Sequence, residues 1–310
     1  MITRKPYLFV VMGIVASSAV YGASASDVVR KAQAANAHVS YRGEKAACVV
    51  VGGRAVCSQM QITHLKPDMT RTQYYSPKML AGVVVVQRGS NVWRYAPRQK
   101  AWERLHSAAS APPDGDIDVA LSNYSVRLLG SEKAVGRDAY VVMATPKRAG
   151  ESVVRLWIDK QSYLTLRTQV EKPSGEIMSS SSFSSIVVNP SGISPSAFAV
   201  TTNEEAVPTV GSLDFCVAEP RYLPEGYKPV GQTKGKVSGH LCVHLQFSNG
   251  VNTISLFERC SKGNAKALKV PGRLTNVLTW TSHEVLFTLI GDLPRSELQK
   301  IADSTGVIRD

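Results

Sequence analysis

The sequence predicts an α+β protein that is mostly β: one large, strongly twisted antiparallel sheet with a few helices, followed by a small C-terminal α+β domain. Between residues 38 and 187, apolar and polar residues alternate and β-branched residues are frequent, as in strands with one buried face. Glycine, proline and asparagine turns interrupt this alternation. Residues 189–211 are rich in Pro, Ser, Thr and Gly without periodicity, which predicts a linker between two domains.

The N-terminus has the three parts of a secretory signal. Arg4 and Lys5 precede an apolar run over residues 7–20, and Ala23-Ser24-Ala25 is the small-x-small pattern of a cleavage site. The run is shorter than the roughly 20 residues that span a bilayer, which disfavours the alternative of an uncleaved anchor. We therefore expect residues 1–25 to be a cleaved signal peptide, and a soluble mature chain in an oxidising, extracytoplasmic compartment.

The chain is basic, with a formal net charge of +12. Its basic residues are scattered and form no long run, which argues against a nucleic-acid partner. In a periplasm the anionic partners would be lipid headgroups, lipopolysaccharide or an acidic protein segment, and plain solubility is the alternative reading.

The first domain is expected over residues 26–188. Ser26 and Asp27 can cap a helix that runs to about residue 37. A first group of strands then follows, at 38–51, 54–64, 69–76, 82–88, 91–95 and 101–105. After a loop and a short helix at 117–122, strands resume at 124–129, 138–145, 152–159, 163–171 and 176–187.

The second domain is expected over residues 212–310. Its strands are predicted at 213–217, 228–234, 240–247, 252–258, 276–280 and 285–290. A closing helix runs from Arg295 to Ser304, with Pro294 at its start and Leu298 and Ile301 on one face.

Two of the five cysteines lie in a predicted hairpin. A two-residue turn at Gly52-Gly53 is favoured because both positions need positive φ. That register places Cys48 opposite Cys57 at a non-hydrogen-bonded pair, where Cα atoms approach to about 4.5 Å. The spacing predicts a Cys48–Cys57 disulfide, and free buried thiols are the alternative.

The other three cysteines are Cys216, Cys242 and Cys260. His240, Cys242 and His244 share one face of a predicted strand, so a metal site is conceivable. The spacing is not a usual zinc pattern and no fourth ligand is evident, so we favour a polar strand face with Cys242 bridged to Cys216 or Cys260. The sequence does not decide between these two pairings.

No catalytic motif is present. The chain lacks Gly-x-Ser-x-Gly, His-Glu-x-x-His, a phosphate-binding loop and a dinucleotide fingerprint, so we predict no enzyme, no cofactor and no metal site. Gly226 and Gly250 are interpreted as turn glycines. What remains for function is a surface or a cavity.

A large curved sheet can fill its concave side with side chains or leave it open for an apolar ligand. Alternation places several apolar side chains on shared strand faces, and ordinary core packing is the alternative for each of them. These candidate concave-surface residues are Trp93, Tyr95, Tyr140, Val142, Leu156 and Ile158.

Several short motifs of the first domain resemble the half-open β-barrel of the LolA/LolB lipoprotein carriers and of the N-terminal domain of the RseB/MucB sigma-E regulatory proteins. They are residues 86–97 (Val-Gln-Arg-Gly-Ser-Asn-Val-Trp-Arg-Tyr-Ala-Pro), Asn123-Tyr124-Ser-Val126, Gly136-Arg137-Asp-Ala-Tyr140 and Leu156-Trp-Ile-Asp-Lys160. The order of these motifs is more specific than any one of them.

The second domain resembles the C-terminal domain of the RseB/MucB proteins, which the simple carriers lack. The motifs are Tyr222-Leu-Pro-Glu-Gly-Tyr227, Phe247-Ser-Asn-Gly250, Ile254-Ser-Leu-Phe-Glu258 and Leu289-Ile-Gly-Asp-Leu-Pro294. The five cysteines are not part of the family pattern.

The resemblance implies a periplasmic protein that binds the periplasmic part of a membrane anti-sigma factor and shields it from proteolysis. Such a protein restrains an extracytoplasmic-function sigma factor and the envelope stress response, and lipid or lipopolysaccharide would relieve the restraint. The alternative is a periplasmic lipid or lipoprotein carrier of the LolA type. Partner sequence, ligand and oligomeric state are not predicted.

Overall fold

The computed structural model describes residues 23–51, 53–105, 117–201, 217–237, 240–260 and 276–307. Most of the predicted signal peptide, residues 1–22, lies outside these ranges. Among the described residues, no helix is long and apolar enough to cross a membrane. We call residues 23–201 the first unit and residues 217–307 the second unit.

The first unit is built on one eleven-stranded antiparallel sheet. Its first group of strands is β1 (Tyr41–Val51), β2 (Arg54–Leu65), β3 (Met69–Ser76), β4 (Val84–Arg88), β5 (Asn91–Ala96) and β6 (Ala101–Leu105). Its second group is β7 (Tyr124–Ala134), β8 (Arg137–Pro146), β9 (Val153–Asp159), β10 (Thr165–Glu171) and β11 (Ile177–Val188).

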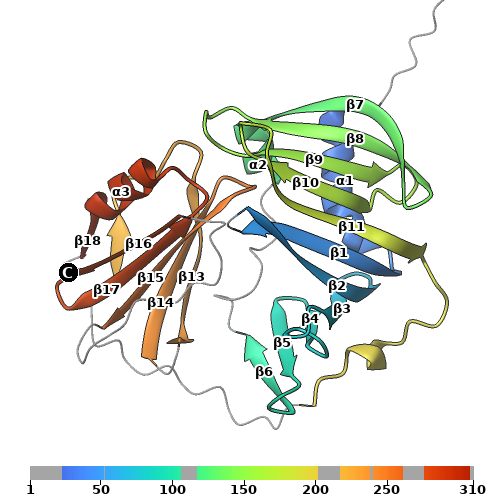
Figure 1. Cartoon of the computed structure of the whole chain (residues 1–310), viewed down its shortest axis with the longest axis horizontal. Coiled ribbons are helices and arrows are strands. Elements are labelled where there is room, and N and C mark those ends of the chain that lie inside the picture. The colour runs from blue at the N-terminus through green and yellow to red at the C-terminus, as the bar shows by residue number, and fades with distance from the viewer. Residues whose placement is uncertain are drawn as a thin grey trace, which may run out of the picture.

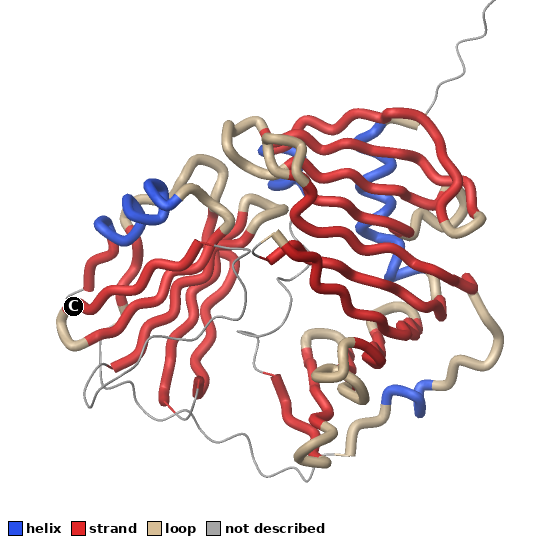
Figure 2. The backbone as a smooth tube through the Cα atoms, in the orientation of Figure 1, coloured by secondary structure: helices blue, strands red, loops and turns tan. Residues whose placement is uncertain are grey.

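Each group is a meander in which neighbours along the chain pair with each other, and β1 pairs with β11 to join the two. The outer strands β6 and β7 stand at opposite ends of the sheet order, so among the described strands the sheet is a half-open barrel, as predicted. Figures 1 and 2 show this curved sheet on the right of the molecule. The alternating sequence pattern explains it, because successive side chains of a strand point to opposite faces.

Helix α1 (Ala25–His38) lies behind the sheet in Figure 1. Its fully buried Val28 packs with Val142 and Ile158 of β8 and β9. The helix begins earlier than predicted, because the Ser24 side chain accepts the Asp27 backbone N–H at 3.1 Å and is the N-cap. A second short helix, α2 (Ile117–Asn123), leads directly into β7.

The stretch predicted as a linker begins with ordered packing. A short 3₁₀ helix, η2 (Pro195–Phe198), buries Phe198 completely against Val84 and Val86 of β4. Residues 189–201 therefore belong to the packing of the first unit, and residues 202–216 lie outside the described ranges.

The second unit has a five-stranded antiparallel sheet in the order β13-β14-β15-β17-β16, a separate two-stranded sheet of β12 and β18, and one helix that packs on the larger sheet. The elements are β12 (Ala218–Pro220), β13 (Lys228–Val237), β14 (His240–Ser248), β15 (Thr253–Cys260), β16 (Asn276–Ser282), β17 (Val285–Gly291), α3 (Arg295–Ser304) and β18 (Thr305–Val307). Leu298 and Ile301 of α3 are fully buried in one core cluster with Leu256 and Leu289, so the helix packs through the face that its sequence predicts.

Candidate functional site

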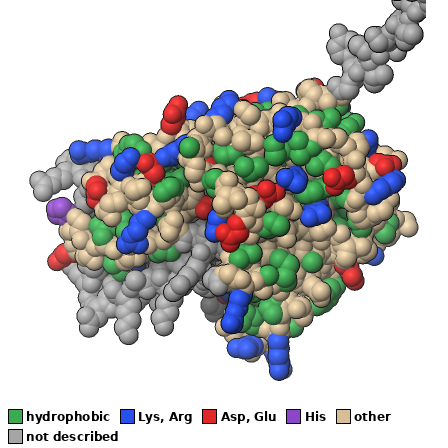
Figure 3. Space-filling model, turned by 45° about the horizontal axis from the view of Figure 1, so that its top comes forward, with side chains coloured by type: hydrophobic (Ala, Val, Ile, Leu, Met, Phe, Trp, Pro, Cys, Tyr) green, Lys and Arg blue, Asp and Glu red, His purple; other side chains and the backbone are tan. Residues whose placement is uncertain are grey.

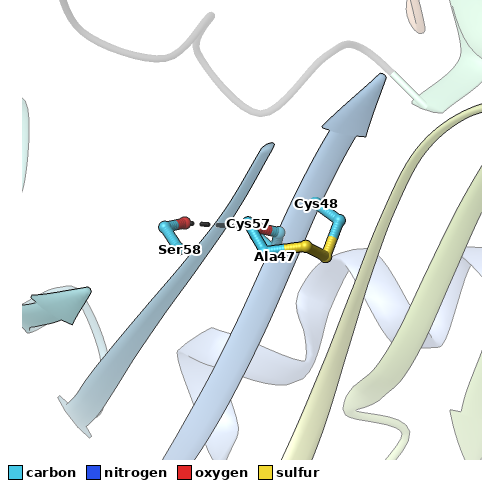
Figure 4. Close-up of a disulfide and its surroundings, with 4 residues drawn as sticks. All are labelled: Ala47, Cys48, Cys57 and Ser58. Atoms are coloured by element: carbon cyan, nitrogen blue, oxygen red, sulfur yellow. Dashed lines mark hydrogen bonds between the residues drawn. A yellow bond between two sulfur atoms is a disulfide. The ribbon is translucent and has the colours of Figure 1, made fainter. Parts of the chain in front are cut away.

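The predicted disulfide is present. β1 and β2 pair in the expected register, with Cys48 opposite Cys57 and their Cα atoms 4.0 Å apart. Figure 4 shows the bond across the two strands, beside the hydrogen bond from the Ser58 hydroxyl to the Ala47 carbonyl oxygen. Cys57 is exposed, so the disulfide lies at the surface of the hairpin.

The candidate concave residues fall into two places. Tyr140, Val142, Leu156 and Ile158 form one cluster beneath α1, where Val142 and Ile158 are fully buried. At the other end of the sheet, Tyr95 packs with Trp102 in the cluster around Phe198, and Trp93 carries the Arg88 guanidinium 4.5 Å above its ring. The six residues thus line no single surface, because β8–β9 and β5 are separated by most of the sheet.

The polar face of β14 is buried. Cys242 and His244 are each 3% exposed, and the His244 ring stacks on Phe257 with centroids 4.1 Å apart. Cys242 and Cys260 are both free thiols, so the predicted Cys242–Cys260 pairing does not form, and Cys216 lies outside the described ranges. In the described part of the chain, no group of three or more His, Cys, Asp or Glu side chains is placed to hold a metal ion.

The strongest candidate for a functional site is the polar junction between the two units. At its centre is Asn123, the last residue of α2. Its amide Nδ2 donates within the first unit to the Val119 carbonyl oxygen at 2.9 Å, and across the junction to the carbonyl oxygens of Gly226 at 3.1 Å and Asn249 at 2.9 Å. The Asn123 side chain thereby connects two separate turns of the second unit to the first unit.

Two glycines allow this close approach. Gly226 and Gly250 both have positive φ, as turn glycines do. A Cβ on Gly250 would lie 2.3 Å from the backbone nitrogen of Ala120 in α2, and one on Gly226 would lie 2.2 Å from Asn123 Oδ1. Their second role, as contact points between the units, could not be read from the turn pattern.

A buried carboxyl group lies next to these turns. Glu151 is 3% exposed, and its Oε2 accepts hydrogen bonds from Asn249 Nδ2 at 2.9 Å and from the Tyr124 hydroxyl at 3.4 Å. The Tyr124 hydroxyl also accepts from Asn252 Nδ2 at 2.9 Å. Burial raises the pKa of Glu151 above its usual value, and the nearby Arg148 opposes the rise.

An ion pair and a further hydrogen bond complete the junction. Arg148 Nη2 lies 2.6 Å from Glu297 Oε2 on α3, and Ser152 Oγ donates to Asp292 Oδ2 at 3.0 Å. Hydrogen bonds from Lys300, Arg148 and Tyr222 lower the pKa of Glu297 to about 2, so this carboxylate stays charged at neutral pH.

Several residues of the junction lie in sequence motifs whose shared location the sequence alone does not reveal. Asn123-Tyr124, the Pro-Glu-Gly226 turn, Asn249-Gly250 and Asp292 all stand in the family-like motifs, and they are distant in sequence. They meet in the structure because α2 is packed between two loops of the second unit.

A pocket of about 620 Å³ lies elsewhere, on the part of the sheet formed by β3–β5. Its apolar lining includes Tyr74, Met79, Leu80 and Val85, and its basic lining is Lys78, Arg94 and Arg98. On the face in Figure 3, Lys and Arg side chains stand among apolar, acidic and neutral ones.

Comparison with known proteins gives a family and a fold. Residues 24–210 match the family model described as the MucB/RseB N-terminal domain. The solved structure of the Pseudomonas aeruginosa MucA/MucB complex aligns with a TM-score of 0.69 at 17% identity, covering 92% of this chain and 99% of that one. A crystal structure of MucB aligns with a TM-score of 0.68 at 18% identity, covering 92% of this chain and 98% of that one. The crystal structure of MucB in complex with MucA(peri) aligns with a TM-score of 0.66 at 17% identity, covering 92% of this chain and 100% of that one. No curated protein sequence matches the chain.

Proposed function

The chain belongs to the MucB/RseB family, and we propose that it is a periplasmic negative regulator of an extracytoplasmic-function sigma factor. It acts by binding the periplasmic part of a membrane anti-sigma factor and shielding that segment from proteolysis. The observation that carries the proposal is that the family match is accompanied by the complete two-unit fold of MucB, a protein also solved in complex with MucA.

The junction supports a regulator rather than a rigid scaffold. Hydrogen bonds and one ion pair around Asn123, Glu151 and Arg148 connect the units, and the turn at Gly250 packs on the backbone of Ala120. Interfaces of this polar kind between domains are typical of units that change their relative position. A partner that touches both units would bind one arrangement best, and a second ligand that prefers another arrangement would lower the partner's affinity by the same coupling free energy.

We also propose that the restraint responds to lipid, through the apolar face beneath α1. The residues of α1 that the mature chain keeps and that pack on Tyr140, Val142, Leu156 and Ile158 are small, namely Val28, Val29 and Ala32. The free energy needed to separate α1 from the sheet grows with the apolar area buried between them. A helix that packs through alanine and valine is therefore easier to displace than one that packs through leucine or phenylalanine. An acyl chain would take its place.

The first test is affinity capture with residues 26–310 immobilised and detergent-solubilised envelope extract passed over them. Retention of a single-pass membrane protein with a cytoplasmic sigma-binding domain supports the proposal. Retention of many lipoproteins without such a membrane protein contradicts it and favours the alternative, a lipid or lipoprotein carrier.

Protease protection tests the shielding step directly. The purified periplasmic segment of the captured partner is digested by a site-one protease with and without this protein, and we expect slower cleavage when it is bound. Unchanged cleavage at saturating protein would contradict shielding while leaving binding intact.

The lipid response is tested separately by native mass spectrometry of gently purified protein. We expect co-purifying acyl chains, and added lipid should release the captured partner. Protein that binds its partner but neither carries nor responds to lipid would overturn this part of the proposal.

A further inference from the structure

One edge of the hairpin that carries the disulfide has no neighbouring strand in the described part of the chain. Pairing of β1 with β11 ends at Val49, opposite Ser179, and pairing of β2 with β3 ends at Gln59, opposite Ser76. Within the described residues, the end of β2 from Arg54 to Ser58 therefore pairs only with β1. On the other side of the hairpin β11 still pairs with β1 at Cys48, opposite Ser180, so the disulfide fixes this end of β2 to a strand inside the sheet.

The chain after β3 leaves this edge open. Residues 77–82 turn back toward β4, since the Gly82 N–H donates to the Tyr74 carbonyl oxygen and the Tyr74 N–H to the Val83 carbonyl oxygen. Residues 53–57 are exposed, and Val56 is 49% exposed. The outer edge of β2 is thus accessible next to where β3 stops.

Hairpin geometry gives the direction of the backbone groups on this edge. The Cα separation of 4.0 Å assigns Cys48–Cys57 to the non-hydrogen-bonded type of pair. Residues of such pairs point their N–H and C=O groups away from the partner strand, and pair types alternate along the strand. Ala55 and Cys57 consequently point their backbone donors and acceptors outward.

The pocket begins at the same place. Ser58 is part of its lining, as are Met79 and Leu80 from the loop that follows β3, and Met79 is 77% exposed. Lys78 and Arg98 add positive charge, while Arg94 is paired with Glu103. Of the described residues that line the pocket, none is acidic.

We propose that the outer edge of β2, from Arg54 to Ser58, binds an extended peptide as an added antiparallel or parallel strand, with an apolar side chain in the adjacent pocket and acidic residues near Lys78 and Arg98. Strand addition gains affinity from main-chain hydrogen bonds and specificity from pockets for alternate side chains. The acidic preference follows from the charge of the pocket. The inference rests on the proposed function only for the identity of the peptide, which would be the bound segment of the anti-sigma factor.

The test compares Ala55→Pro with Ala55→Thr in the full mature chain. Proline removes one outward N–H without removing a β1–β2 hydrogen bond, whereas threonine keeps the N–H and favours a strand. The probe is a fluorescein-labelled peptide of sequence Glu-Val-Thr-Val-Thr-Val-Glu, followed by fluorescence anisotropy. We expect the proline variant to bind about tenfold more weakly, the effect of one lost hydrogen bond, and the threonine variant to bind like wild type.

Mass spectrometry of the disulfide and circular dichroism establish that both variants are folded. A peptide whose glutamates are replaced by lysines should bind more weakly than the probe. Equal binding of the peptide by the proline variant and wild type would overturn the proposal. So would a concentration-dependent dimer of wild type, seen in analytical ultracentrifugation and absent in the proline variant, because the edge would then bind a second copy of the chain.

The captured anti-sigma segment separates the two proposals. If wild type and the proline variant bind it equally, this edge is not its site, although the proposed function stands. If wild type captures no anti-sigma factor but binds the model peptide in the expected order, the edge is confirmed as a peptide site and the proposed function fails.

Discussion

At the scale of single residues, two glycines have the most specific contacts at the junction. Gly250 has a φ of +90°, and because it lacks a Cβ the backbone of α2 can lie directly against it. Gly136 offers a matched comparison, because it also has positive φ, +76°, but no atom lies within 4 Å of the position of its absent Cβ.

We expect Gly250→Ala to disturb the junction and Gly136→Ala to leave it intact. Both variants strain a left-handed backbone, which costs about 1 kcal/mol. Only the Gly250 variant also forces the two units apart, so its particle dimensions in small-angle X-ray scattering should grow. Identical scattering for the two variants would show that the turn at residue 250 shifts to accommodate the added methyl group without moving the two units apart.

Glu258 is a fully buried acid in the second unit. Its Oε2 accepts the Ala218 N–H at 3.0 Å, while Oε1 has no hydrogen-bond partner among the described residues. Burial raises its pKa to about 7. The native protein thus holds this proton more tightly than the unfolded chain, in which a glutamate titrates near its ordinary pKa of about 4.3.

The stability contributed by this proton is full below the ordinary pKa and is lost as the pH rises through about 7. Between pH 5 and pH 8 the free energy of unfolding of wild type should therefore fall. Glu258→Gln cannot titrate, so we expect its free energy of unfolding to fall by about 2 kcal/mol less over the same range. Urea unfolding at the two pH values measures the difference. The exposed Glu225, which is not among the groups that shift the Glu258 pKa, provides the control, since Glu225→Gln should follow wild type.

At the scale of elements, the Cys48–Cys57 disulfide crosses the β1–β2 hairpin between directly opposed residues. We expect the double variant Cys48→Ser, Cys57→Ser to be less stable by about 2–3 kcal/mol, the loop-closure entropy of a bridge over this short separation. Unfolding in denaturant with and without a reductant gives the measurement. The reductant should destabilise wild type and leave the double variant unchanged, and equal stability of the two oxidised proteins would contradict a stabilising role.

At the scale of the whole molecule, the junction determines whether the two units unfold together. We expect Asn123→Ala to remove the hydrogen bonds to Gly226 and Asn249, leave two carbonyl oxygens unpaired and separate the thermal transitions of the units. Differential scanning calorimetry would resolve the two transitions. The control is Asn276→Ala, whose amide bonds the Leu293 carbonyl oxygen inside the second unit and should lower only the transition of that unit.

A single transition in the Asn123 variant, at the wild-type temperature, would show that residues other than the polar contacts hold the units together. A separated transition would support coupling between partner and lipid through the arrangement of the units. In that case the same variant should bind the captured partner with altered affinity.

The sequence by itself determined nearly all of the local structure. Alternation and turn residues predicted the strands of the eleven-stranded and five-stranded sheets but not the short β12–β18 pair, and the Gly52-Gly53 turn predicted the register that brings Cys48 to Cys57. These are short-range properties, because side-chain period and turn geometry depend on neighbours along the chain. The order of short motifs also indicated the family, which the match over residues 24–210 confirmed.

Only the tertiary structure decided which residues meet across the two units. Asn123, Glu151 and Asn249 look like ordinary loop polar residues in sequence, and their shared cluster arises from long-range packing of α2 against turns of the second unit. The same holds for the cover of α1 over Val142 and Ile158, and for the open edge of β2, which depends on where β3 and β11 stop pairing. Periodicity tells which face of an element is apolar, but the partner of that face is set by the fold as a whole.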